Sequence, residues 1–108
     1  MKFDSAPNQM IYDELLPLVV GREEEVQRFE EFLRENTSWL SAPASTTYLT
    51  LPGGLVEHSV HVARTMLMMR EFMAPDLSRE SCVIVSLYHD VGLVLVEFFA
   101  NELIHMYY

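Results

Sequence analysis

Four residues on two segments of the chain carry side chains that could bind a metal ion. His58 and His61 lie within the stretch 55–73, and His89 and Asp90 form a doublet in a later apolar stretch. Imidazole and carboxylate groups together suit Zn, Mn, Fe or Ni rather than a soft thiolate site. A bound divalent ion lowers the pKa of a coordinated water and so yields a hydroxide nucleophile. These residue types are therefore candidates for the ligands of a divalent metal ion.

Each of these residues also has an alternative interpretation without a ligand role. His58 would then be a core histidine bonded to a backbone carbonyl, and His89 and Asp90 would be a buried pair at a helix end. His61 would be a polar residue on the flank of a helix. Arg64 is either an exposed helix arginine or a bidentate partner for a substrate phosphate.

Two motifs in a fixed order favour the ligand interpretation. LPGGLVEHSVHVA occupies 51–63, and LYHDVG follows at 87–92, about thirty residues later. In order, spacing and helical setting the two motifs resemble those of the HD-domain superfamily of metal-dependent phosphohydrolases. The resemblance covers about residues 51–92, which is under half of the chain.

The resemblance implies a metal centre and an activity. His58, His89 and Asp90 match the family's metal ligands, and His89 and Asp90 match its catalytic doublet, with His61 and Arg64 as possible additions. The cofactor implied is a divalent metal ion: Mn, Fe, Ni, Zn or Mg. The implied substrate is a phosphorylated small molecule, with nucleotides among the candidates. The implied fold is all-α, a compact helical bundle similar to the N-terminal part of an HD domain.

The chain departs from the family pattern after Gly92. The family's final Asp ligand lies tens of residues beyond the doublet, but no Asp follows Asp90 in this sequence. The lysine often found after His-Asp-x-Gly is replaced by Leu93. We therefore expect a single, incomplete domain over residues 1–108 with impaired activity, as a truncated gene or a shifted reading frame would produce. Glu97, Glu102 and His105 are substitutes for the Asp in principle, but we expect each to face solvent.

Composition limits the class of partner. Seven Lys and Arg against sixteen Asp and Glu give a net charge of −9. Binding to nucleic acid rests on neutralising phosphates with Lys and Arg, so nucleic acid is not an expected partner. A basic anchor on an anionic membrane is equally unexpected. With no apolar leader and one cysteine, Cys82, we expect a cytoplasmic protein without an internal disulfide.

The hydrophobic spacing predicts helices that would position the candidate ligands. Their predicted ranges are 9–16, 22–35, 55–73, 79–90 and 93–106, with a loop at 36–53. Ser78 is predicted to cap the fourth helix, and Gly92 to end or bend it. Consecutive helical residues point about 100° apart, so His89 and Asp90 can share a site only near a helix end. We expect four methionines to fill the core: Met66, Met68, Met69 and Met73.

A second hypothesis is a non-catalytic helical remnant that acts by association. An incomplete domain would expose apolar surface that the apolar stretch 93–99 could cover within one chain or between chains. Because a large exposed apolar patch often marks an interface, we expect a homodimer or a higher homo-oligomer.

Overall fold

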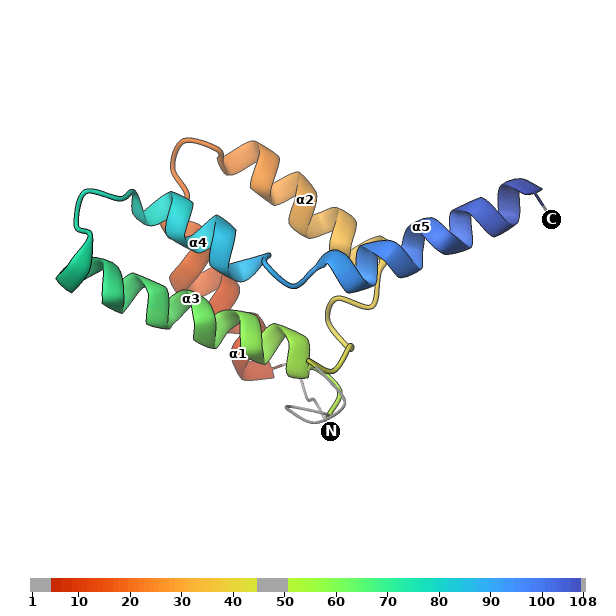
Figure 1. Ribbon diagram of the computed structural model, residues 1–108, viewed down its shortest axis with the longest axis horizontal. Coiled ribbons are helices and arrows are strands. Elements are labelled where there is room, and N and C mark those ends of the chain that lie inside the picture. The colour runs from red at the N-terminus through yellow and green to blue at the C-terminus, as the bar shows by residue number, and fades with distance from the viewer. Residues whose placement is uncertain (1–4, 45–50, 108) are drawn as a thin grey trace.

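Every regular element in the described part of the chain is helical. The computed structural model describes residues 5–44 and 51–107 and arranges their helices as a small bundle with one projecting helix (Figure 1). The prediction of an all-α fold is therefore confirmed. The elements are α1 Ser5–Met10, η1 Ile11–Leu15, η2 Leu16–Leu18, α2 Glu23–Asn36, α3 Gly54–Met73, α4 Arg79–Leu87 and α5 Gly92–Tyr107.

The N-terminal helix is longer and less regular than the predicted range 9–16. It begins as the α-helix α1, widens into the π-helical turn η1 and tightens into the 3-10 turn η2. Ile11 and Leu15, one turn apart, are both buried and fix this segment to the core. Pro17 lies in the first turn of η2, where its missing N–H removes no helical hydrogen bond.

The helix α2 matches its predicted range 22–35 closely. Three glutamates occupy its first turn, where the helix dipole favours negative charge. At its end, Asn36 Nδ2 donates to the Phe32 carbonyl at 3.1 Å. At its start, the backbone N–H groups of Arg22 and Gly21 donate to Glu80 at the start of α4, and these bonds lower the pKa of the Glu80 carboxyl. This contact fixes the beginning of α2 against α4.

Helix α3 packs against α4 and begins after a glycine turn. Gly53 has a φ of 85°, a left-handed conformation that other residues adopt at a cost, and α3 starts at the next residue. The first half of α3 buries Val56, Val60 and Ala63. The predicted core role of the four methionines was wrong, because they are 39–75% exposed. α3 lies at the edge of the bundle, where α4 and α1 cover one side of it (Figure 1).

The predicted helix 79–90 ends three residues early. Ser78 caps α4 as expected, since its Oγ accepts from the Ser81 N–H at 3.0 Å, but α4 stops at Leu87. Residues 88–91 form a turn, closed by the Val91 N–H donating to the Tyr88 carbonyl at 3.3 Å. Gly92 therefore begins α5 instead of ending α4, which corrects the role predicted for it.

Helix α5 confirms the helix predicted at 93–106 and extends from the bundle (Figure 1). Its base is anchored by the buried Val94 and by Phe98, whose ring meets Phe32 edge-on at 5.2 Å. Further along, Phe99 and Ile104 are more than half exposed. Across the described ranges, no helix combines the length and apolar character that crossing a bilayer requires.

Candidate metal centre

Three predicted ligands meet at the junction of α3 with the turn after α4. His58 Nε2 lies 3.4 Å from Asp90 Oδ2, and His89 Nε2 lies 3.1 Å from the same oxygen. The two imidazole rings are 5.3 Å apart between centroids. One ligand atom from each of the three residues falls within 4.8 Å of the others. The structure thus brings together residues about thirty positions apart in the sequence.

The backbone fixes the orientation of His89. Its Nδ1 lies 2.6 Å from the Ser86 carbonyl oxygen, which can only accept a hydrogen bond, so Nδ1 carries the proton. The other ring nitrogen, Nε2, therefore faces Asp90, with the His58 ring beside it. Metal-ligating histidines are commonly oriented by such a bond from the other ring nitrogen.

The donor set fits a divalent transition metal. Two imidazole nitrogens and one carboxylate oxygen form a ligand set found in catalytic zinc centres, where water takes the remaining position. Ligand atoms of a tetrahedral ion bound at about 2.1 Å are separated by about 3.4 Å. The distances from His58 and His89 to Asp90, 3.4 and 3.1 Å, are close to that spacing. All three side chains are partly exposed, so the site is open to solvent.

The alternation of buried and exposed residues explains why the ligands face outward. On α3, Ser59 and Val60 are fully buried, whereas His58 is only partly covered. In the second segment, Leu87 and Val91 are buried on either side of the exposed His89–Asp90 doublet. Because the doublet occupies a turn and not the helix end that the sequence predicted, both of its side chains reach one site.

A buried glutamate next to this turn was missed in the sequence. Glu30 of α2 is 2% exposed, and its carboxylate accepts from the Tyr88 hydroxyl at 2.7 Å, the Arg34 Nε at 2.6 Å and the Trp39 Nε1 at 3.1 Å. Burial, followed by the charge of Glu30, raises the pKa of Tyr88, so the phenol stays protonated and donates. Its burial could have been predicted from its position, because Glu30 lies on the same side of the helix as the buried Val26 and Leu33.

The two additional candidates lie on the exposed side of α3, outside the ligand group. His61 and Arg64 are exposed and, with Thr65 and Met68, line an open groove of about 430 Å³ along α3. Arg64 forms no hydrogen bond or ion pair within the described part of the chain. It is therefore available to a ligand in the groove.

The residues considered as substitutes for the missing Asp do not join the centre. Glu97, Glu102 and His105 are exposed on α5, as expected, and none belongs to the group formed by the three ligands. Within the described residues, no fourth protein ligand completes this group.

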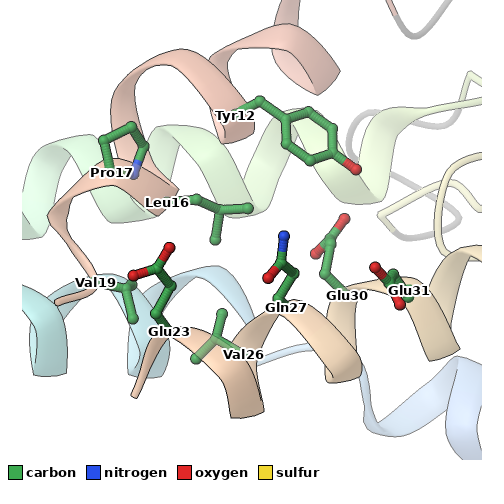
Figure 2. A pocket seen from close by; sticks show the side chains of 9 residues that line it. All are labelled: Tyr12, Leu16, Pro17, Val19, Glu23, Val26, Gln27, Glu30 and Glu31. Atoms are coloured by element: carbon green, nitrogen blue, oxygen red, sulfur yellow. The ribbon is translucent and has the colours of Figure 1, made fainter. Parts of the chain in front are cut away.

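A separate pocket of about 290 Å³ lies between the N-terminal helical segment and α2 (Figure 2). Leu16, Val19 and Val26 form part of its apolar wall, and the polar ends of Tyr12 and Gln27 border it. None of the candidate metal ligands lines this pocket. Its connection with the centre is through Glu30, which lines the pocket and binds Tyr88.

Comparison of the chain with protein-family models, curated proteins and solved structures gave no match.

Proposed function

We propose that the chain is an HD-type metal-dependent phosphohydrolase that acts on a phosphate ester, with nucleotides among the candidate substrates. The observation that carries this proposal is the convergence of His58, His89 and Asp90, whose ligand atoms lie within 4.8 Å of one another. These are the three residues that the motif resemblance assigns to a metal. The proposal includes a cytoplasmic location and no nucleic-acid partner.

The chain's own residues have distinct roles in this proposal. A bound divalent ion supplies positive charge to the phosphoryl oxygens and lowers the pKa of its water. His58 and His89 present neutral nitrogens to the ion, and the Ser86 carbonyl holds His89 in the required tautomer. Asp90 would contribute a carboxylate oxygen to the ion. Three protein ligands leave positions for water and substrate.

The groove on α3 is the position that we propose for a substrate anion. His61 is one helical turn from His58, and Arg64 follows one turn later along the same groove. A guanidinium binds a phosphate through two parallel hydrogen bonds. We assign His61 and Arg64 to this contact. Because the chain is strongly acidic, with a net charge of −9, substrate binding depends on Arg64 and on the charge of the metal.

Metal analysis and hydrolysis of simple esters test the proposal. Purified protein supplied with Mn, Ni, Co or Zn is expected to retain one or more equivalents and to hydrolyse p-nitrophenyl phosphate or its bis-ester. His89→Ala and Asp90→Asn each remove a ligand and are expected to reduce metal affinity and kcat/KM at least about 100-fold. His105→Ala and Asp76→Asn are matched controls, since both residues are exposed and outside the centre. Absence of bound metal, or activity that survives both ligand variants, would overturn the proposal.

The exposed side of α5 favours a second candidate function, association without catalysis. Val96, Phe99 and Ile104 are 55–66% exposed on a helix that extends away from the bundle (Figure 1). A helix of sixteen residues is only marginally stable without packing. We therefore propose that a second copy of the chain covers this side of α5, giving a homodimer.

Sedimentation equilibrium tests the association. The wild-type protein is expected to be dimeric at micromolar concentration, and Phe99→Glu to shift it toward monomer by raising the dissociation constant at least about tenfold, because a charge in an apolar interface is costly. Glu102→Gln, an exposed change on the same helix, serves as the control. A wild-type monomer at 50–100 µM (about the highest routine range) would contradict this candidate.

A further inference from the structure

The carboxylate of Glu30 is buried in the interior, and both of its oxygens accept hydrogen bonds. Three donors bond to it: Oε1 accepts from the Tyr88 hydroxyl at 2.7 Å, and Oε2 accepts from Arg34 at 2.6 Å and from Trp39 at 3.1 Å. A buried carboxylate is costly unless it is hydrogen-bonded and paired with a positive charge, and both conditions are met here. The ion pair with Arg34 is local, whereas the bond to Tyr88 spans 58 residues.

The long-range bond ends next to the metal centre. Tyr88 is the residue directly before His89 and the first of the turn 88–91. Its ring is enclosed by Phe29, which it meets edge-on at 5.0 Å, and by Trp39 at 6.0 Å. The hydrogen bond from the Tyr88 hydroxyl to Glu30 restrains the far end of the side chain. Tyr88 is therefore held both at its ring and at its hydroxyl group.

The turn is therefore held from the inside while its ligands face out. Leu87 and Val91 are buried, and the Val91 N–H closes the turn onto the Tyr88 carbonyl at 3.3 Å. Between these fixed points the backbone has little room to rotate. The Nε2 of His89 and the Oδ2 of Asp90 are placed 3.1 Å apart as a result.

We infer that Glu30 is a positioning residue for the metal centre: by holding Tyr88, it fixes the turn that carries His89 and Asp90. This inference rests on the proposed function, because it concerns the geometry of the same centre. Glu30 does not contact the ligand atoms, and its role passes through Tyr88. Changes in groups that orient metal ligands typically lower metal affinity about 10–100-fold.

Tyr88→Phe is the most direct test, because it removes the hydroxyl and keeps the ring in its aromatic surroundings. The full chain is titrated with Mn²⁺ by isothermal calorimetry, and the affinity of Tyr88→Phe is expected to fall about tenfold. Glu30→Gln is the second variant. It is expected to give a similar or larger loss, because the amide replaces a charged acceptor of three bonds.

Val19→Ala is the matched control for a general loss of stability. Val19 is buried and directly follows η2. The turn η2 packs against α4, and the nearby Gly21 N–H donates to Glu80 at the start of that helix. Urea unfolding establishes whether Val19→Ala is destabilised as much as Tyr88→Phe. Val19 lines the same pocket as Glu30 but makes none of the hydrogen bonds that hold Tyr88 and the turn 88–91. At equal destabilisation, Val19→Ala is therefore expected to keep the wild-type Mn²⁺ affinity within about twofold.

A second readout separates failure of the inference from failure of the proposed function. If the wild-type protein binds no metal, the proposed function fails, and the imidazole NMR signals of His58 and His89 in metal-free protein decide the inference. Tyr88→Phe and Glu30→Gln are expected to shift the His89 signals, and Val19→Ala to leave them in place. The inference is overturned if the Tyr88 and Glu30 variants match Val19→Ala in both affinity and imidazole signals.

Discussion

Replacing Trp39 with alanine is expected to remove much of the stability of the fold. The indole is fully buried, and truncating a buried Trp costs about 3–5 kcal/mol in transfer and cavity terms. The variant also withdraws the Nε1 donor from the buried Glu30 carboxylate, which adds about 1–3 kcal/mol. Against a typical domain stability of about 5–15 kcal/mol, this loss is expected to leave a partly unfolded population at 25 °C.

Urea unfolding followed by far-UV circular dichroism measures this effect, because Trp39 is the only tryptophan and its fluorescence is lost in the variant. Trp39→Phe keeps an aromatic ring and loses the donor, so an intermediate loss of about 1–3 kcal/mol is expected. Ser41→Ala, an exposed change two residues away, is expected to stay within about 0.5 kcal/mol of wild type. A Trp39→Ala midpoint close to that of Ser41→Ala would show that the indole is not a core element.

Metal binding is expected to raise the unfolding temperature by a large amount. A ligand that binds only the folded state at 100 times its dissociation constant adds about 2.7 kcal/mol. For a chain of this size that corresponds to a rise in Tm of roughly 10–20 °C. The rise is expected to disappear in Asp90→Asn and His58→Ala, because each removes one of three ligands.

Differential scanning calorimetry with MnCl₂ or with EDTA checks the stabilisation. Since imidazole binds a metal only when it is deprotonated, the rise is expected to shrink as the buffer is made acidic. Asp76→Asn is the control, and its Tm is expected to rise with metal as in the wild type. An equal rise in Asp90→Asn and wild type would place the metal somewhere other than the proposed centre.

The features that could be predicted from the sequence are those with a local signature. The regular apolar spacing of 22–35 and 55–73 predicted α2 and α3 to within a residue at each end. Ser78 was identified as a cap because a serine before an apolar stretch is a typical helix start. The ligands of the candidate centre were identified from motif order, and the structure brings His58, His89 and Asp90 together.

The features that were missed depend on contacts between distant segments. Apolar composition alone extended the predicted helix to residue 90, whereas α4 ends at Leu87 and is followed by a turn that the Val91 N–H closes on the Tyr88 carbonyl. The core role predicted for the methionines of α3 assumed that neighbours cover their side of the helix, but these side chains are 39–75% exposed. Glu30 looked like one of many charges on α2, because its partner Tyr88 lies 58 residues away.

Helix α5 is joined to α4 only through the turn 88–91, the same turn that holds two of the three candidate ligands. A change in the direction of α5 that is transmitted through this turn would change the separation of His89 and Asp90 from His58. The metal affinity of the site would then depend on the direction of α5. Thermodynamic linkage makes such coupling reciprocal. If a molecule binds better to one orientation of α5 and thereby changes the metal affinity by some factor, the bound metal changes the affinity for that molecule by the same factor.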